Sequence, residues 1–576
     1  MEYHGTAQRK QAQLWERIPQ EWRLSPSLIP PGMHSPAESV TNVQYDRVNV
    51  MDIPRSCGLL SSKEIGITEN WDIRGLLSQI HSQALTAKEV VEAFCKRAAI
   101  AHQLTRCLTE PLFEPALQRA QELDDHLRRT STPIGPLHGL PISIKDSFNI
   151  RGVDSSVGIA ALALHPSDQD APLVSLLQSL GAIIITKTNV PQTMGALDSA
   201  NHLFGRTLNP QNRQLTVGGS TGGEGALLAL RGSMLGFGTD IGGSIRVPAM
   251  CNGLYGFKPS PGRVPFGGQT DGQPKAKGRI SIQAVAGPLA HSIADIDAVM
   301  SHLIPKAQWF AEDCIPGAWP SPLSSFGHNK TRPITIGILP SDGLVQPLPP
   351  ITKVLNEVAN ALHRIPGVAV VQIPVPKALS KCQSIAGRLM GVDGGVNMMD
   401  LLESTNEPLI PWLQTRIKRG KPLLLSQLAE LQAARGAIEL ELRRKLWMQG
   451  GSGNEDEQTI DAIIHPVAPH PVPELDRYNA VGYTSSFVLL DYPAGTVPVR
   501  KFGEGDLERG KEMGGSVIGS WDKANRELWD EKTVDRTVYL DSPLSVQVVT
   551  PKQHDYELFQ AMELVDRAIK TDRSKL

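Results

Sequence analysis

The sequence lacks paired cysteines, long apolar runs and an excess of charge of either sign. Its six cysteines are scattered without a C-x-x-C pair, which excludes the spacing typical of metal-binding and redox motifs. No run approaches the ~18 apolar residues of a membrane span, and the N-terminal segment contains no apolar stretch of signal-peptide length. We therefore expect a soluble intracellular chain with no membrane span.

The charge balance and the glycine content both favour an enzyme. With 57 Lys and Arg against 59 Asp and Glu, the formal net charge is -2. A nucleic-acid-binding chain needs a basic field to neutralise phosphates, so we expect no nucleic-acid partner. The 52 glycines and 44 prolines are about 17% of the 576 residues, above the ~12% of average usage. Because they are interleaved with apolar segments, they favour a loop-rich enzyme over disorder.

Short apolar strands alternate with helical patterns from Leu137 onwards. The clearest helical pattern covers residues 423–447. Buried or alternating apolar residues predict strands at 181–185, 334–338, 368–373 and 462–464. This alternation predicts an α/β fold with a large mixed, mainly parallel β-sheet covered by helices on both faces.

The sequence predicts one large domain with an N-terminal extension. Residues 1–75 contain short helical pieces and a stretch rich in proline and serine, which predicts a helical and irregular extension. Residues 76–570 show no composition shift that would mark a second domain, so we expect a single catalytic domain there. Thr86 and Glu89 have the spacing of a capping box at the start of its first helix.

The final tripeptide, 574–576, reads Ser-Lys-Leu. This is the address that the peroxisomal import receptor reads. We therefore expect a peroxisomal protein with that receptor as a partner, and a cytoplasmic location is the alternative.

The most informative segment is the glycine-rich stretch at 216–260. Glycine lets the backbone approach a ligand closely and adopt positive φ angles. A phosphate-binding Walker loop is excluded because the segment lacks the G-K-[ST] ending. A dinucleotide fingerprint almost appears after Gly236, but Ile241 occupies the position of its third glycine.

Residues 218–222 also fit the G-x-S-x-G pattern of a nucleophile elbow. This interpretation predicts an α/β-hydrolase-type esterase with Ser220 as the nucleophile. Such an enzyme needs a downstream histidine, for which His465 and His470 are candidates, although both lie among prolines.

Several blocks of sequence share an order with one known family. The blocks are GLPISIKDSFNIRG (139–152), GAIIITKTNVPQTM (181–194), GGSTGGEGA (218–226), GTDIGGSIRVP (238–248) and GLYGFKP (253–259). Together they resemble the amidase signature family, close to its fungal acetamidase and fatty acid amide hydrolase branch. The resemblance extends over roughly residues 85–500, because weaker similarity continues beyond the last block. It implies the mixed α/β fold of that family.

The resemblance also implies a catalytic triad. Ser244 matches the acylated nucleophile, Ser220 matches the bridging serine that follows a cis peptide bond, and Lys145 matches the base. The family usually has a second serine where this chain has Thr221, and we expect its hydroxyl to keep a supporting hydrogen bond.

The same family pattern places the substrate contacts. Met194 matches a side chain that contacts substrate. The oxyanion hole falls on the backbone N–H groups of Ile241, Gly242, Gly243 and Ser244. Ser220 also borders the substrate site. The family pattern implies no metal and no organic cofactor, and a homodimer stays open as an assembly.

Amide hydrolysis explains why these residue types are needed. A serine hydroxyl is inert at its ordinary pKa, so a base must activate it. Lysine is a base only when neutral, and burial can lower its pKa enough. Lys145 follows the alternating Leu140, Ile142 and Ile144, which predicts a place at the end of a strand.

The sequence therefore predicts an amidase that converts a carboxylic acid amide into the free acid and ammonia or an amine. Asp240 and Arg246 flank the nucleophile, and we expect them to form an ion pair that holds its loop. A glutamine-dependent amidotransferase subunit, the Ser220 esterase and a non-hydrolytic binding protein are the alternatives. Small aliphatic, fatty, aryl and specialised-metabolite amides all stay open as substrates.

Overall fold

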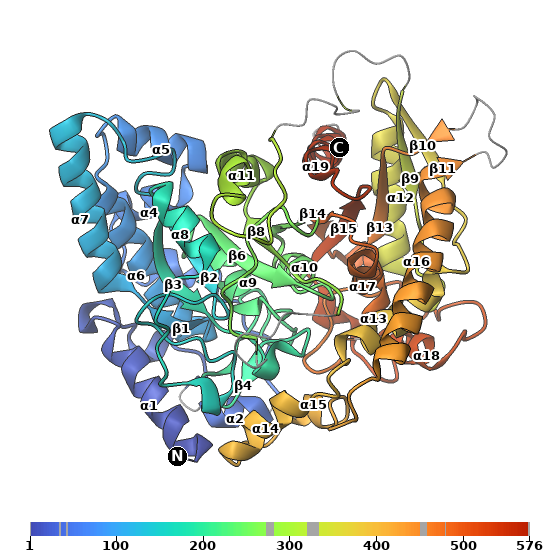
Figure 1. The fold of residues 1–576 in the computed structure, drawn as a ribbon, viewed down its shortest axis with the longest axis horizontal. Helices are drawn as coiled ribbons and strands as arrows, with labels where there is room; N and C mark the ends of the chain where they lie inside the picture. Colours follow the sequence, from blue (N-terminus) through green and yellow to red (C-terminus); the bar gives the residue numbers. More distant parts are fainter. Residues whose placement is uncertain are drawn as a thin grey trace.

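A sheet of eleven strands runs through the computed structural model (Figure 1). The structure describes residues 2–33, 36–41, 44–271, 281–319, 326, 333–449, 458–478 and 480–573. In spatial order the strands are β1 (Leu108–Pro111), β3 (Ile183–Thr188), β2 (Pro141–Lys145), β6 (Leu235–Asp240), β8 (Val285–Ala290), β7 (Tyr255–Lys258), β14 (Ala494–Lys501), β15 (Pro543–Val549), β13 (Ala462–Pro466), β9 (Ile334–Ile338) and β10 (Val368–Gln372).

The sheet is mixed, as predicted, but the expectation of mainly parallel strands is wrong. Of its ten pairings four are parallel, namely β3–β2, β2–β6, β13–β9 and β9–β10. The other six pairings are antiparallel.

The physical reason lies in two inserted strands. Strand β8 lies antiparallel between β6 and β7, which are joined through the helix α10 (Arg246–Asn252). Strand β15 lies likewise between β13 and β14, which are joined through α17 (Gly482–Leu489). A strand–helix–strand pattern therefore predicts correctly that its two strands run parallel to each other. It cannot predict that a later strand of the chain lies between them.

Helices cover both faces of the sheet (Figure 1). One layer contains α6 (Ala87–Thr105), α9 (Gly222–Ala229) and α10, and α9 contacts both of the other two. The other contains α8 (Pro172–Ser179), α11 (Ile293–Ala307), α19 (Asp555–Arg573) and α12 (Pro349–His363). The four predicted strands are confirmed as β3, β9, β10 and β13, and the predicted long helix is α16 (Leu425–Trp447).

Helix α6 begins with the predicted capping box. The Glu89 backbone N–H donates to Thr86 Oγ1 at 3.1 Å, and the Thr86 N–H donates to Glu89 Oε2 at 3.0 Å. Helix α6 then packs against α7 (Phe113–Thr130). Among the described residues no helix has both the length and the apolar character needed to cross a bilayer. The final tripeptide 574–576, on which the predicted peroxisomal location depends, lies outside the described residues.

The N-terminal segment packs onto the same core as the rest of the chain. Helix α1 (Tyr3–Glu16) contacts β1, and Ile18 and Trp22 belong to the main hydrophobic cluster. The buried Lys10 ammonium pairs with Glu110 of β1 and lies 2.7 Å from Asp154 Oδ2. The segment predicted as an extension therefore shares its core and a buried ion network with the catalytic domain.

This ion network predicts a stability effect. Lys10→Met should leave the buried Asp154 carboxylate without its cationic partner, at a cost of about 3 kcal/mol or more in the free energy of unfolding. Urea-induced unfolding followed by fluorescence measures the change. Lys63→Met is the matched control, because its pair with Glu89 is solvent-exposed and should contribute less than about 1 kcal/mol. Equal effects of the two substitutions would contradict the assignment.

Candidate active site

Two glycine-rich turns lie next to each other near the middle of the sheet. The first precedes α9 and the second connects β6 to α10, and these two helices pack together (Figure 1). Gly218 has a φ of +81°, and a Cβ there would lie 2.8 Å from the Pro248 Cα. Only glycine permits this approach of the first turn to α10. The Gly219–Ser220 peptide bond is cis, as the family resemblance implies.

Lys145 lies at the end of β2, as predicted, and its side chain is fully buried. Its Nζ donates to Ser220 Oγ at 2.6 Å and to Thr239 Oγ1 at 2.7 Å. Burial lowers the pKa of the Lys145 ammonium from 10.5 to about 7, against the opposing effect of three nearby carboxyl groups. Near neutral pH, much of this lysine is therefore an unprotonated amine.

One of those carboxyl groups belongs to Glu224, which sequence reasoning missed. It is fully buried on α9, where Ser143 Oγ donates to it at 2.5 Å and Thr188 Oγ1 at 2.9 Å. Burial raises the pKa of the Glu224 carboxyl from 4.5 to about 8. One feature of the sequence could have revealed it: Glu224 is an acidic residue in a helix otherwise made of Gly, Ala and Leu. A buried helix rarely contains a carboxyl group unless that group has a partner.

The loop around Ser244, the predicted nucleophile, is held by the predicted ion pair. The Asp240 carboxylate accepts hydrogen bonds from Arg246 Nε and Nη2, both at 3.0 Å, in a fully buried bidentate pair. It also accepts the Gly243 N–H at 2.8 Å. Arg246 Nη1 in turn donates to Gln547 Oε1 at 3.0 Å, which ties the loop to β15. The expectation of an Asp240–Arg246 clamp is confirmed.

The four N–H groups predicted for the oxyanion hole are not equivalent. The Gly243 N–H is bonded to Asp240, whereas those of Ile241, Gly242 and Ser244 have no acceptor within the described residues. Gly243 has a φ of +127°, and a Cβ there would lie 2.5 Å from the Thr484 hydroxyl oxygen. Three N–H donors of this turn therefore have no acceptor within the described part of the chain.

The structure brings two of the three predicted catalytic side chains into contact. Lys145 bonds Ser220, and Ser244 lies on the neighbouring turn with a side chain that is 5% exposed. No hydrogen bond joins the Ser220 and Ser244 hydroxyls among the described residues. The Thr221 hydroxyl lies at the limit of hydrogen-bond distance, 3.5 Å, from the Thr239 carbonyl.

The histidines that the esterase alternative needs are engaged elsewhere. His465 Nδ1 lies 2.8 Å from the Leu339 carbonyl, and its ring stacks on Tyr483. His470 Nδ1 lies 2.8 Å from the Pro471 carbonyl. Within the described residues no histidine bonds Ser220, whose hydroxyl pairs with Lys145 instead. The geometry therefore disfavours a Ser–His arrangement at Ser220.

Met194 lies at the end of the short 3₁₀-helix η4 (Gln192–Met194). Its partly buried side chain belongs to an apolar cluster with Val157, Ile159 and Leu402. Gln192 anchors the segment that carries Leu402, because its Nε2 donates to Glu407 Oε1 at 2.7 Å. The loop that carries Met194 is therefore surrounded by apolar side chains, which the sequence pattern did not predict.

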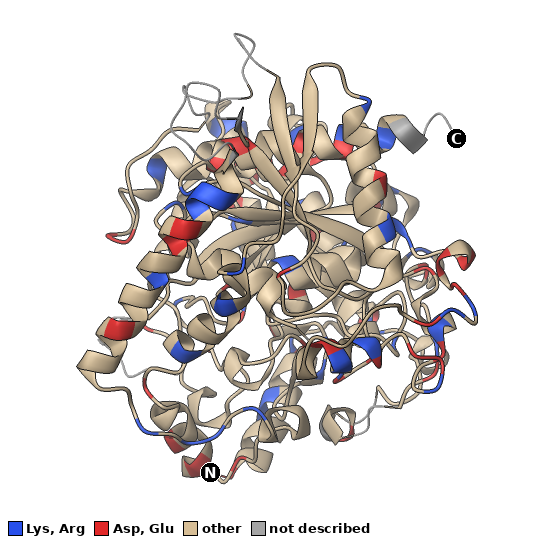
Figure 2. Cartoon of the chain, turned by 90° about the vertical axis from the view of Figure 1, so that its right-hand side faces the viewer, with Lys and Arg blue, Asp and Glu red and all other residues tan. Residues whose placement is uncertain are grey.

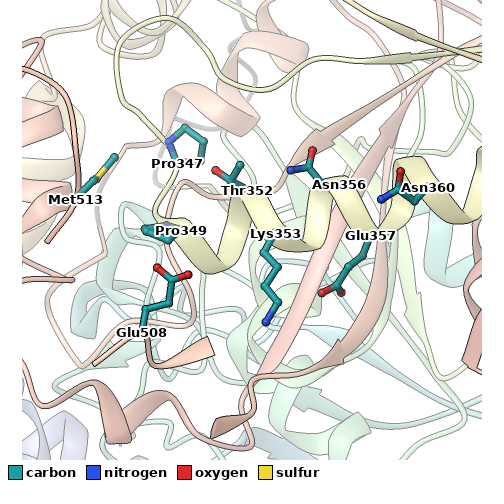
Figure 3. A pocket seen from close by; sticks show the side chains of 9 residues that line it. All are labelled: Pro347, Pro349, Thr352, Lys353, Asn356, Glu357, Asn360, Glu508 and Met513. Atoms are coloured by element: carbon teal, nitrogen blue, oxygen red, sulfur yellow. The ribbon is translucent and has the colours of Figure 1, made fainter. Parts of the chain in front are cut away.

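The surface away from the predicted site residues is also hollowed. An open groove of about 580 Å³ lies along α12, lined among others by Lys353, Glu357 and Met513 (Figure 3). Its charged side chains already have partners, since Lys353 pairs with Asp506 and Glu357 with Arg500. Basic and acidic residues are interspersed along the ribbon in the view of Figure 2. The described residues contain no group of three or more His, Cys, Asp or Glu suited to a metal ion.

Comparisons with known proteins identify the family of this chain. A family model described as Amidase matches residues 89–559. The chain is 32% identical over 564 residues to an acetamidase of Aspergillus oryzae, with 97% of each protein covered. It is 32% identical over 544 residues to an acetamidase of Emericella nidulans, with 94% of this chain and 93% of the relative covered. A solved fatty acid amide hydrolase superposes with a TM-score of 0.83 at 26% identity over 98% of this chain and 95% of that one. These matches confirm the predicted resemblance: the chain belongs to the amidase family of amide-hydrolysing enzymes.

Proposed function

We propose that this enzyme hydrolyses a carboxylic acid amide through an acyl-serine intermediate on Ser244, with Ser220 as the proton relay and Lys145 as the base. One observation carries the proposal. A fully buried lysine nitrogen lies 2.6 Å from the Ser220 hydroxyl oxygen and has its pKa lowered to about 7. A lysine in this state can accept a proton, which an exposed lysine cannot do near neutral pH.

Acylation begins with proton transfer. Neutral Lys145 takes the Ser220 proton as Ser220 takes that of Ser244, and the Ser244 oxygen forms a bond to the amide carbon. The carbonyl oxygen becomes an oxyanion, which the free N–H groups of the 241–244 turn can bind. Each such donor contributes about 2.7–4 kcal/mol in comparable sites.

The same relay then runs in reverse. Ser220 gives a proton to the departing nitrogen, which leaves as ammonia or an amine, and Lys145 returns a proton to Ser220. Water attacks the acyl carbon under the same base and releases the carboxylic acid. The chemistry uses no metal or organic cofactor.

The apolar cluster around Met194 supports one further feature of the substrate. An acyl group that lies against the partly buried Met194 side chain covers apolar surface, whereas a charged acyl group would lose its hydration there. We infer an uncharged aliphatic or aryl acyl group. The relatives named acetamidase and fatty acid amide hydrolase carry names that fit this class.

Labelling with a fluorophosphonate, followed by peptide mapping, tests the nucleophile. The phosphonate should be found on Ser244, and Lys145→Ala should abolish labelling of otherwise folded protein. Phosphonate on Ser220 would instead indicate the nucleophile-elbow hydrolase. Folded protein that takes up no label would favour a partner-dependent amidotransferase subunit or a binding protein.

A further inference from the structure

Two consecutive residues of the loop at 192–198, here the Met194 loop, have a left-handed backbone. The φ angles of Thr193 and Met194 are +66° and +56°. This region is uncommon for residues other than glycine, and a β-branched threonine there is an outlier. Such a conformation persists only where the surrounding structure fixes it, and it recurs at ligand-binding sites. The contacts that fix this loop are therefore candidates for a functional role.

The Met194 loop lies directly against the turn that carries Ser220. A Cβ on Gly219 would lie 2.7 Å from the Ala196 carbonyl oxygen, and it would lie even closer to that of Asp198. The two backbones therefore touch with no side chain between them. Met194 is two residues from this contact, at the edge of the predicted catalytic turn.

The side chain of Gln192 holds the start of the Met194 loop. It is fully buried, and both of its polar atoms are bonded to residues 407–410. Its Nε2 donates to Glu407 Oε1 at 2.7 Å and to the Pro408 carbonyl at 3.0 Å. Its Oε1 accepts the Ile410 N–H at 2.9 Å. One side chain thus joins the loop to a segment more than 200 residues further along the chain.

The Glu407 carboxylate completes this link. It is 5% exposed, and no ion pair joins it to a described residue. Besides Gln192 Nε2 it accepts the Ala160 N–H, which donates to Oε2 at 2.7 Å. Ala160 directly follows Ile159, a member of the apolar cluster that contains Met194. Glu407 therefore joins the Met194 loop to a second segment of the same cluster.

Apolar side chains of the linked segments also meet. Ile410 and Leu413 belong to one hydrophobic cluster with Ala196. They lie at the start of α15 (Pro411–Gln414) and within it, and α15 follows α14 (Val396–Ser404) at the same end of the molecule (Figure 1). The polar link therefore lies within a packed apolar contact, where a broken hydrogen bond leaves a buried polar group without a partner.

We propose that Gln192 and Glu407 are positioning residues that hold Met194 against the acyl group of the substrate and thereby set the selectivity for that group. The inference rests on the amidase function proposed above. Because the two side chains act through Met194, breaking their link should weaken the binding of an amide with a long acyl chain. Acetamide should be affected less, since its single methyl group covers little apolar surface.

Two substitutions that exchange amide and carboxylate test the link. In Glu407→Gln one of the two N–H donors loses its acceptor, and in Gln192→Glu two carboxylates face each other. Each should lower the ratio of kcat/KM for hexanamide to that for acetamide about fivefold or more, mainly through a higher KM for hexanamide. The double variant again places a donor opposite an acceptor. It should recover most of the loss, since only the longer bond to the Pro408 carbonyl is absent. Burial raises the pKa of the Glu407 carboxyl to about 7, so assays at about pH 8.5 keep it mainly ionised in the native protein.

Met194→Ala tests whether the link acts through Met194. It should lower the same ratio, and adding Glu407→Gln to it should cause little further loss, since the positioned side chain is already absent. Asp295→Asn is the matched control. Its buried carboxyl on α11 accepts the Ile73 N–H at 2.8 Å and has no printed bond to the Met194 loop, so the ratio should not change. If either single variant does not fold, Gln192→Asn replaces it, because the shorter amide breaks the link without bringing two carboxylates together.

A measurement that does not need turnover separates this inference from the proposed function. The Met194 methyl resonance, recorded on protein with isotope-labelled methionine methyl groups and assigned by its absence in Met194→Leu, should move in each single variant and return in the double variant. If the native enzyme hydrolyses neither amide, the proposed function fails, and this resonance still decides whether the link positions Met194. An unmoved resonance, an unchanged ratio in both single variants, or a double variant no better than either would overturn the proposal.

Discussion

Ser244→Ala should lower kcat for an amide substrate by roughly 10⁴–10⁶-fold, because it removes the atom that forms the acyl-enzyme. The variant should fold normally, since the turn around Ser244 is held by the contacts of Asp240 rather than by the serine hydroxyl. Steady-state release of ammonia or amine, with single-turnover detection of the acyl-enzyme by mass spectrometry, measures the loss.

Ser220→Ala is the informative comparison for this prediction. It should also reduce kcat strongly, because it breaks the connection between Lys145 and Ser244, but Ser244 can still be acylated slowly by a reactive ester. An acyl group on Ser244 in the Ser220→Ala variant would support the relay assignment. A Ser244→Ala variant that kept substantial amidase activity would contradict the nucleophile.

Lys145→Met should lower kcat/KM by about 10²–10⁴-fold at neutral pH, the range that a positioned general base contributes. In the native enzyme the base must be neutral. Its pKa is lowered to about 7, so kcat/KM should rise about tenfold per pH unit well below pH 7 and level off above it. The rising limb should be absent in Lys145→Met. Initial rates from pH 5 to 9 with a neutral amide substrate measure both effects.

Lys258→Met provides the control for removing a buried lysine. The Lys258 side chain is also fully buried and its pKa is lowered to about 8, but its Nζ donates to the Pro259 carbonyl and not to a catalytic serine. This variant should keep the rising limb, whatever its stability. Loss of the limb in Lys258→Met and its persistence in Lys145→Met would exclude Lys145 as the base.

The sequence predicted much of the site because its residues lie in short, glycine-rich blocks. The turn at 241–244, the strand that ends at Lys145 and the Asp240–Arg246 ion pair follow from neighbouring residues and were predicted. The Glu224 carboxyl was missed, because its partners Ser143 and Thr188 come from two other strands of the sheet. The bond between the Gly243 N–H and Asp240 was also missed, since it depends on how the loop closes.

The sequence alone determined the family, the mixed α/β fold and the identity of the candidate catalytic groups, since these follow from local residue patterns and their order. Tertiary structure decided what depends on distant contacts. The antiparallel entry of β8 and β15 between helix-linked strands accounts for four of the six antiparallel pairings. Burial among separate elements, which no local pattern encodes, lowered the pKa of Lys145 and raised that of Glu224. Desolvation is a property of the packed molecule, so only the tertiary structure could show which charged groups it affects.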